Sequence, residues 1–305
     1  MFPAKGEWRI MNKIKKIAAT ALALLYLLCG AGCQSSNQDY VFFGDFIFYK
    51  VDDGYGVRLV YDYKGTEVVI PSHFWFKPVT ELHTDFVQGS ISRYTVTKIV
   101  IPDTVKRIGV QSFYACTSLQ SIEIPDSVEE IGDRAFAYCD SLQSITLPDS
   151  VKTLGESAFY SCDNLKEIVL SDSLVYIGRE TFEDCISLEG ITIPGGVKTI
   201  SEGAFRNCVS LSNVTISYGN LGSIKTEAFR GCSALTRMTI PFSVYEIEQY
   251  TFFDCDKLKE VVFGEPKGWR TVYSWFSEDD LKDPTTAAAY LTDVQGQLVW
   301  HQFDE

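Results

Sequence analysis

The sequence predicts an α/β solenoid, a stack of similar coils, and two observations support this fold class. Between Ile101 and Phe263 the same pattern of residues is written seven times at a regular step, and a single step is one residue longer than the others. In every copy a phenylalanine is followed three residues later by a cysteine, and apolar residues keep fixed places around that pair. A constant period in the twenties is typical of solenoids, in which each repeat forms one supersecondary unit.

A single copy of the repeat indicates how one coil is built. The L-x-x-I-x-L spacing of residues 142–147 predicts a short strand whose apolar side chains face inward. Residues 156–161 are predicted to form a short helical turn that buries Phe159. One coil alone buries too little apolar surface to offset its loss of backbone entropy, so the coils must stack.

The repeat resembles the pattern A-F-x-x-C-x-x-L-x-x-I-x-I-P-x-x-V-x-x-I-G of the BspA-like class of bacterial leucine-rich repeats. The resemblance extends over residues 68–263. It implies a right-handed leucine-rich-repeat solenoid with a parallel sheet along one face. It also implies a secreted or surface-exposed bacterial binding protein, since several such proteins are linked to adhesion. The architecture by itself identifies no ligand.

Residues 1–32 are typical of an export signal. The natural start is Met11, because residues 1–10 fit no such signal. Three lysines between residues 13 and 16 form a basic region, and residues 17–28 form an apolar region of the usual length. The uncharged stretch is too short for a permanent membrane span, which needs about 20 apolar residues.

Gly30-Ala-Gly-Cys33 resembles a bacterial lipobox, although glycine stands where leucine is usual. The resemblance implies that Cys33 is diacylated and becomes the mature N-terminus. The alternative is an ordinary signal peptide that is cleaved nearby. Residues 33–39 are polar and suit a short flexible spacer. We therefore expect an exported protein that is attached to the bacterial cell envelope by its N-terminal lipid only, and that is exposed at the surface.

Residues 40–67 are predicted to form a small β-meander that caps the first coil. The turn dipeptides Asp53-Gly54 and Lys64-Gly65 separate short runs of strand-forming residues in this segment. Such meanders begin many proteins of the class that the repeat resembles.

The first coil is longer than the others, since Ile70 and Ile101 hold equivalent places in the pattern but lie further apart than one regular step. The excess predicts two loops, near residues 72–78 and 88–95. The first loop holds a cluster of four candidate binding residues, namely His73, Phe74, Trp75 and Phe76. Aromatic side chains on a loop can bind a protein or a sugar, but a terminal coil also needs its core covered. Both interpretations stay open at this point.

Residues 264–305 are predicted to form a small α+β cap at the other end. Asp283 followed by Pro284 is typical of a helix start, and residues 297–301 could form a last strand. The core of this cap is assigned to three tryptophans: Trp269, Trp275 and Trp300.

Cysteine and aspartate each recur at a fixed position of the repeat. The seven cysteines keep register with phenylalanine, which favours buried free thiols over disulfides that would distort the coils unequally. A row of aspartates follows the predicted strands: Asp103, Asp126, Asp149 and Asp172. These could hold calcium, but a turn role is preferred. No other metal or cofactor site is expected, because the repeat contains no histidine and no C-x-x-C pair.

The composition argues against two classes of function. The net charge of −13 becomes −17 without residues 1–32, which carry five basic residues and one acidic residue. So acidic a chain is a poor candidate for binding nucleic acid. The three histidines lie outside the regular repeats, and no G-x-S-x-G, H-E-x-x-H or phosphate-loop motif is present. We therefore expect no enzymatic activity.

Two classes of function remain. The first is a monomeric, adhesion-type module that binds an extracellular protein or glycan, and the second is a structural envelope scaffold without a specific ligand. In the first case the binding face consists of the outward positions of the predicted strands, which are mostly small and polar. Fifteen residues make up this candidate face: Lys98, Val100, Ser121, Glu123, Ser144, Thr146, Glu167, Val169, Thr192, Asn213, Thr215, Arg237, Thr239, Glu260 and Val262.

Overall fold

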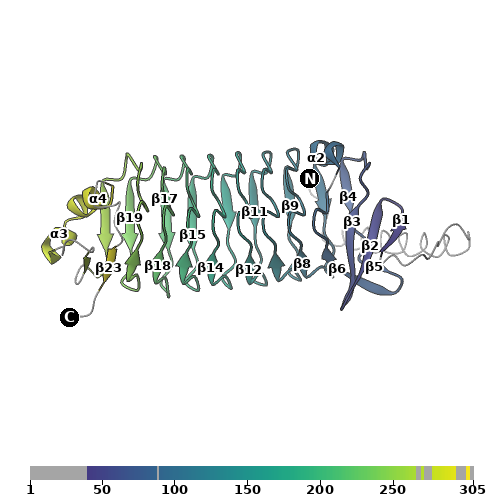
Figure 1. Ribbon diagram of the computed structural model, residues 1–305, viewed down its shortest axis with the longest axis horizontal. Coiled ribbons are helices and arrows are strands. Elements are labelled where there is room, and N and C mark those ends of the chain that lie inside the picture. The colour runs from purple at the N-terminus through teal and green to yellow at the C-terminus, as the bar shows by residue number, and fades with distance from the viewer. Residues whose placement is uncertain (1–39, 88, 266–268, 271–276, 293–299, 303–305) are drawn as a thin grey trace, which may run out of the picture. The chain divides into compact units, whose positions relative to one another are not determined.

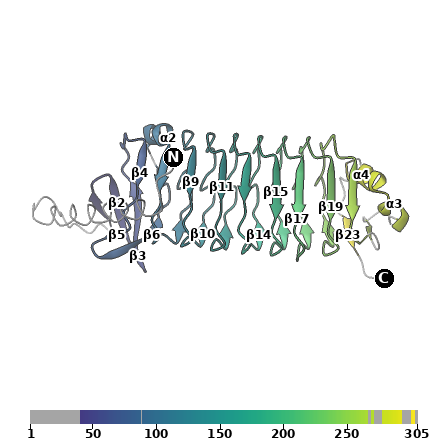
Figure 2. The same ribbon diagram turned by 180° about the vertical axis from the view of Figure 1, so that it is seen from behind.

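The computed structural model describes residues 40–87, 89–265, 269–270, 277–292 and 300–302. Residues 42–305 form one compact unit, in which successive coils stack along a single axis, as Figures 1 and 2 show from opposite sides. The predicted parallel-sheet solenoid is confirmed. The export signal, Cys33 and the spacer up to residue 39 lie outside the described residues.

Each coil contributes one strand of three or four residues to a parallel arrangement that we call the long-strand sheet, in which ladder hydrogen bonds join the strands in groups of two or three. Ile145 lies opposite Ile168, its equivalent one repeat later, so equivalent residues of successive coils form rows along the sheet. Its strands are β4 (Glu67–Val69), β7 (Lys98–Val100), β9 (Ser121–Glu123), β11 (Ser144–Thr146), β13 (Glu167–Val169), β15 (Gly190–Ile193), β17 (Asn213–Ile216), β19 (Arg237–Ile240) and β21 (Glu260–Phe263). In Figure 1 these strands form the upper row.

A second parallel row, which the sequence pattern did not predict, is built from strands of two residues each. In six of these strands one residue is buried and its neighbour is exposed or half-buried, as with Leu154 and Thr153, whereas both residues of β18 are buried. The row consists of β8 (Arg107–Ile108), β10 (Glu130–Ile131), β12 (Thr153–Leu154), β14 (Tyr176–Ile177), β16 (Thr199–Ile200), β18 (Ser223–Ile224) and β20 (Glu246–Ile247). It forms the lower row in Figure 1. Each of these coils therefore carries two strands.

The short helical turn expected at residues 156–161 is wrong, because this segment is a loop. Ser157 and Ser161 have φ angles of 53° and 50°, in the left-handed region. The N–H groups of Ser157, Phe159 and Ser161 donate to carbonyl oxygens of the next coil at 2.8–2.9 Å. An α-helix would instead need bonds to residues four positions earlier in the same segment. The loop thus joins neighbouring coils, and the equivalent loops of the other coils repeat the same left-handed positions.

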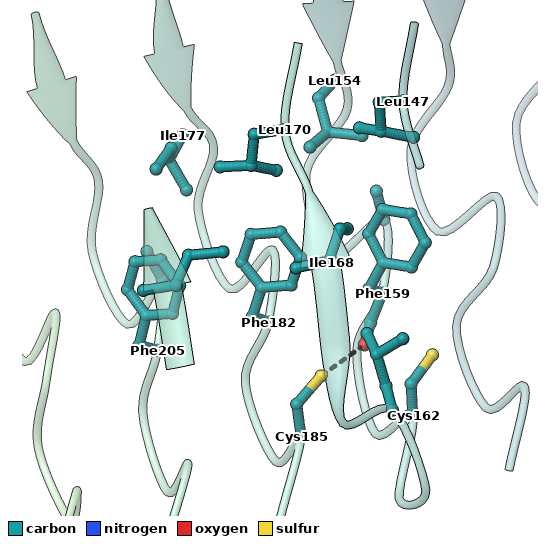
Figure 3. Packing of buried hydrophobic residues seen from close by; sticks show 14 of the residues in the cluster. Leu147, Leu154, Phe159, Cys162, Ile168, Leu170, Ile177, Phe182, Cys185 and Phe205 are labelled. Carbon is teal, nitrogen blue, oxygen red and sulfur yellow. Dashed lines mark hydrogen bonds between the residues drawn. The ribbon is translucent and has the colours of Figure 1, made fainter. Parts of the chain in front are cut away.

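A stack of phenylalanine rings forms the centre of the core. From Phe136 to Phe252, neighbouring rings lie 5.2–5.6 Å apart between centroids, and their planes differ by no more than 12°. Every ring in this stack is fully buried. Figure 3 shows Phe159, Phe182 and Phe205 packed beside the aliphatic side chains of the two strands.

The repeated cysteines are buried free thiols with a defined partner. The Sγ atom of each cysteine from Cys139 to Cys255 donates to the backbone carbonyl oxygen of the phenylalanine in the preceding coil, at 3.0–3.3 Å. Figure 3 shows this bond between Cys185 and Phe159. A thiol at this position therefore fills the core and also satisfies a buried acceptor.

One coil holds an extra residue, and the strand registers locate it. In the long-strand sheet Ile193 pairs with Ile216 at the regular step, whereas in the short-strand row Ile200 pairs with Ile224, one position beyond that step. The extra residue therefore lies at the corner between the two strands. A Cβ atom on Gly219 would lie 2.0 Å from the carbonyl oxygen of Gly195, so this corner requires glycine.

The N-terminal end of the described chain extends the short-strand row into an antiparallel hairpin. Its elements are β1 (Tyr40–Phe43), β2 (Phe46–Val51), β3 (Gly54–Leu59), β5 (His73–Phe74), β6 (Lys77–Leu82) and α2 (Ser90–Thr95). Strands β2 and β3 are antiparallel, and β3 pairs with β6, which pairs in turn with β8. The loop predicted at residues 72–78 is the hairpin β5–β6, and much of the second predicted loop is helix α2.

The C-terminal end carries the elements β22 (Trp269–Arg270), α3 (Glu278–Lys282), α4 (Pro284–Thr292) and β23 (Trp300–Gln302). Helix α4 begins at Pro284, where the sequence predicts, and Oδ1 of Asp283 accepts hydrogen bonds from the N–H groups of the two threonines that follow. Trp269 and Trp300 are buried, whereas Trp275 lies outside the described residues. None of the helices described here has the length and apolar composition needed to cross a bilayer.

Candidate functional site

The long-strand sheet brings all fifteen residues of the candidate face to its outward positions. Fourteen of them are exposed and Val262 is half-buried. They lie in two rows, because strand alternation leaves two outward positions on each strand. Two further outward residues, Glu67 and Val69 on β4, belong to the same rows. These two escaped prediction because the long first coil hid the spacing that links them to Lys98 and Val100.

One row of the candidate face consists almost entirely of β-branched side chains. Its members are Val69, Val100, Glu123, Thr146, Val169, Thr192, Thr215, Thr239 and Val262. Val100 and Val169 are 40% and 57% exposed. The row therefore presents methyl and hydroxyl groups at the spacing of the strands, with a single charge, and no large side chain interrupts it.

The second row of the candidate face holds most of its charges, and those near the two ends are paired across strands. Lys98 Nζ lies 2.8 Å from Glu67 Oε1, and Arg237 Nη1 lies 3.6 Å from Glu260 Oε2. All four side chains are about half exposed or more, and exposed pairs of this kind contribute only about 0–1 kcal/mol. A ligand can therefore replace these pairings at little cost.

Two hollows on the described surface lie away from the candidate face. The first, about 460 Å³, is lined by loop residues such as Asp133, Arg134 and Arg179. The second, about 500 Å³, is lined by residues of the corners, including Asp103 and Asp126. Neither hollow is lined by any of the fifteen predicted residues. The candidate face is thus an open surface, which suits an extended ligand better than an enclosed small molecule.

The aromatic loop divides its residues between packing and exposure. Phe74 is buried, and its ring stacks on Phe48 with centroids 4.0 Å apart and an interplanar angle of 5°. Trp75 and Phe76, by contrast, are 57% and 94% exposed, and His73 is also exposed. Phe74 therefore covers the core at this end, while its two neighbours are available to a partner.

Trp75 and Phe76 form the two-residue turn of the β5–β6 hairpin. Their φ angles are 48° and 65°, as in a type I′ turn, which strongly prefers Asn-Gly because both central residues are left-handed. Holding a non-glycine residue in such a conformation costs on the order of 1–3 kcal/mol. The ring of Trp75 makes an edge contact with that of Phe74, at 6.2 Å between centroids, but neither Trp75 nor Phe76 is buried in return.

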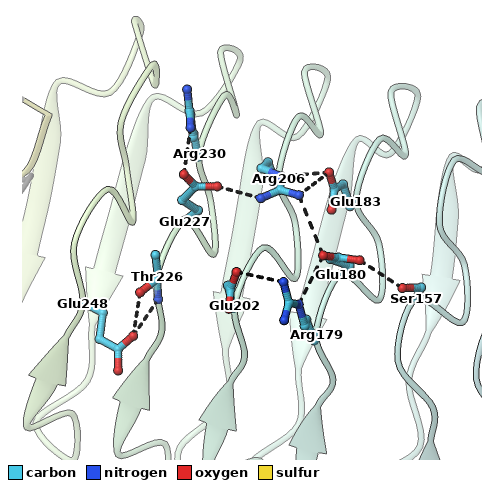
Figure 4. Close-up of polar contacts among 10 residues, drawn as sticks. All are labelled: Ser157, Arg179, Glu180, Glu183, Glu202, Arg206, Thr226, Glu227, Arg230 and Glu248. Atoms are coloured by element: carbon cyan, nitrogen blue, oxygen red, sulfur yellow. Dashed lines mark hydrogen bonds and ion pairs between the residues drawn. The ribbon is translucent and has the colours of Figure 1, made fainter.

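The loops carry a network of ion pairs that the repeat pattern did not reveal, shown in Figure 4. Arg206 lies at its centre, 2.6 Å from Glu183 and 2.6 Å from Glu227. Glu183 is only 5% exposed, and burial raises its pKa while the hydrogen bond from Arg206 acts in the opposite direction. The available signal was the charge that directly follows Phe182, Phe205 and Phe229 in successive coils. Because this network links successive coils, we assign it to stability.

The aspartate row and the other possible metal-binding side chains form no metal site among the described residues. Among the described residues, no three histidine, cysteine, aspartate or glutamate side chains gather where they could hold a metal ion. In the aspartate row, Oδ1 of Asp149 accepts a hydrogen bond from the backbone N–H of Asp172, one coil later, at 3.1 Å, so this carboxylate joins two coils.

The solved structures most informative for this chain are bacterial repeat proteins. A leucine-rich repeat protein of Treponema pallidum is 34% identical, with a TM-score of 0.57, over 63% of this chain and 88% of that one. A leucine rich cell surface protein of Faecalibacterium prausnitzii is 26% identical, with a TM-score of 0.52, over 79% of this chain and 58% of that one. A leucine-rich repeat protein of Eubacterium ventriosum, 23% identical with a TM-score of 0.51, covers 82% of this chain and 55% of that one and shares its fold.

This chain spans little more than half the length of the second and third of these proteins. A comparison of this chain with curated proteins found no match. The BspA type leucine-rich repeat region matches in six copies, over residues 89–208 and 158–277. These matches cover more than half of the sequence, and they coincide with the coils described above. The chain belongs to the BspA type leucine-rich repeat family.

Proposed function

We propose that this chain is a lipid-anchored bacterial surface protein whose long-strand sheet binds an extracellular protein or glycan without catalysing a reaction. The observation that carries the proposal is the pair of outward rows, which are exposed, regular and free of any evident role in the fold. Family membership and the description of the F. prausnitzii protein as a cell surface protein support the location.

The dimensions of the long-strand sheet favour an elongated ligand. Nine strands about 4.8 Å apart extend over roughly 38 Å, and a strand of three residues is about 10 Å long. The resulting area of about 400 Å² is roughly half of what one partner contributes to a standard protein–protein interface, about 800 Å². A glycan chain or an extended peptide can lie along such a strip. A folded protein partner would need further contacts from the corners beside the sheet.

A binding screen against glycans and extracellular matrix proteins tests whether the chain has a ligand. For any ligand found, affinity is then measured for two matched variants. The test variant replaces Glu123, Glu167, Arg237 and Glu260 by alanine. The control variant replaces four exposed residues on or beside the short-strand row by alanine: Glu130, Thr153, Tyr176 and Lys198. We expect affinity to fall at least about tenfold in the first variant, equivalent to about 1.4 kcal/mol, and to be unchanged in the second. The reverse result would place binding on the other row.

The lipid anchor is tested separately at Cys33. Metabolic labelling with a fatty-acid analogue should mark the wild-type chain and should fail to mark Cys33→Ala. The control is Cys29→Ala, since this nearby cysteine lies four positions before the proposed acylation site. Equal labelling of Cys33→Ala and the wild type would exclude acylation at this residue.

A further inference from the structure

The exposed aromatic pair at the tip of the β5–β6 hairpin calls for a partner. Phe76 is almost completely exposed, and Trp75 is more than half exposed. Both adopt left-handed φ angles that disfavour bulky side chains. Asparagine and glycine would make the same two-residue turn without strain. The ring of Trp75 touches only the edge of Phe74 in this hairpin, and strained residues with so little packing are typical of functional sites.

The base of this hairpin lies beside the first strand of the chain. The rings of Phe43, on β1, and Phe74, on β5, have centroids 5.8 Å apart. Phe42, next to Phe43, is 63% exposed. Cys33 precedes Tyr40, where β1 begins, by seven residues, and an extended segment of that length spans at most about 25 Å. A lipid on Cys33 would therefore hold the start of β1 within about 25 Å of the bilayer surface, and Phe43, ten residues after Cys33, within about 35 Å.

The chemistry of the hairpin tip suits the boundary between lipid headgroups and acyl chains. Tryptophan is enriched there because its ring is apolar and its N–H is polar. Lys77, which follows Phe76 directly and is exposed, can contact anionic headgroups. The strongly acidic chain as a whole would not adsorb to such a surface by charge, so contact must be local.

We propose that Trp75 and Phe76 insert into the interface of the bilayer that carries the lipid anchor, with Lys77 at the headgroups. This inference rests on the proposed acylation of Cys33. Two acyl chains on Cys33 would already give stable membrane attachment, so the role of the hairpin tip is to orient the solenoid on the bilayer. Attachment at two points restricts how the solenoid can rotate about its tether.

The test uses the chain from residue 33 onward, which contains the whole compact unit of residues 42–305, with a hexahistidine segment in place of Cys33. Vesicles of phosphatidylcholine and phosphatidylglycerol, doped with a nickel-chelating lipid, supply the tether, so the result does not depend on acylation. Brominated acyl chains quench the fluorescence of tryptophans that enter the bilayer. We expect quenching in the wild type and its loss in Trp75→Asn/Phe76→Gly. The other three tryptophans of this chain, Trp269, Trp275 and Trp300, give the background, and Trp269 and Trp300 are buried.

Two controls make the result specific. Tyr218→Asn/Phe242→Asn removes another exposed aromatic pair, whose ring centroids are 5.6 Å apart, in later coils, and quenching should persist. Trp75→Asn/Phe76→Gly should also unfold at the same temperature as the wild type or a higher one, because it relieves backbone strain. Absence of quenching in the tethered wild type overturns the inference, as does a wild-type dimer in solution that this variant dissociates. Failure of fatty-acid labelling at Cys33 would refute the anchor alone.

Discussion

The thiol of Cys185 donates a hydrogen bond to the backbone carbonyl oxygen of Phe159, one coil earlier, at 3.1 Å. Cys185→Ala should lower the free energy of unfolding by about 1–3 kcal/mol, because it removes this bond and leaves a small void beside the phenylalanine stack. Urea unfolding measures the difference. Asp163→Ala, at an exposed position of the preceding coil, should stay within about 0.5 kcal/mol. Equal midpoints for the two variants would show that the thiol bond does not matter.

Stability should fall steeply in alkali. Burial raises the pKa of Cys116 and of Cys255 from about 9.0 to about 12, and it raises the pKa of the cysteines between them as well. Above pH 9 the unfolded chain loses thiol protons that the folded chain keeps, so unfolding becomes more favourable. Each cysteine contributes a slope of about 1.4 kcal/mol per pH unit until its folded pKa is reached.

Denaturant unfolding at several pH values between 8 and 11 checks this alkaline effect. Cys116→Ala should reduce the fall in unfolding free energy per pH unit by the contribution of one thiol. An unchanged fall in this variant would assign the effect to groups other than this thiol. Thiol reagents should also fail to react with the folded protein and should react once it unfolds.

The pairing of Arg206 with Glu183 predicts a large effect of removing one partner. Arg206→Met leaves the carboxylate of Glu183 buried without its cation, which should cost about 3–5 kcal/mol near pH 7. Because the pKa of Glu183 is raised in the folded state, this cost should shrink as the pH is lowered and the carboxylate becomes neutral. Urea unfolding at pH 7 and pH 4 measures both effects.

Lys152→Met is the matched control for Arg206→Met. Lys152 pairs with Glu129 at 2.7 Å, but the two side chains are 65% and 47% exposed. Loss of an exposed pair should change stability by less than about 1 kcal/mol. A cost for Arg206→Met no larger than that of this control would mean that Glu183 is hydrated in solution.

The phenylalanine stack predicts that stability depends on inward residues and hardly on the candidate face. Phe159→Ala, in the middle of the stack, should cost roughly 3–5 kcal/mol, whereas the exposed Thr146→Ala should stay within about 0.5 kcal/mol. Guanidinium unfolding of the two variants compares them. Similar midpoints would show that the assignment of the inward face is wrong.

The periodicity of the sequence was sufficient to predict the long-strand sheet and the core. Alternation within the strand identified Ile145 as inward and Thr146 as outward, which the structure confirms. The short-strand row escaped prediction because a strand of two residues, such as β12, has one buried position and therefore no alternation to detect. The loop was mistaken for helix because neither Ser157 nor Ser161 is a glycine. The signal lay in later copies of the repeat, where Gly203 and Gly231 stand at the equivalent positions and also have positive φ angles.

The residues of the candidate site that recur in every coil could be predicted from the sequence. Those that belong to one turn or one ion pair could not. The outward residues follow from strand alternation in every coil. The different fates of Phe74 and Phe76 follow from a two-residue turn whose residues are not those that normally form it. The pairing of Glu183 with Arg206 required the stacking of two coils to be known first, since the two residues are far apart in the sequence.

The corner that holds the extra residue shows how this architecture can change. Both parallel ladders keep their register around it, since Ile216, before the corner, and Ile224, after it, lie opposite their equivalents in the preceding coil. Tyr218, at that corner, is 87% exposed. The N–H of Asn220 still donates to the carbonyl oxygen of Gly195 in the preceding coil at 3.1 Å, but the ladder hydrogen bonds are made by the strands on either side of the corner. The edge of each coil can therefore gain length and new chemistry independently, while both rows of strands keep their spacing.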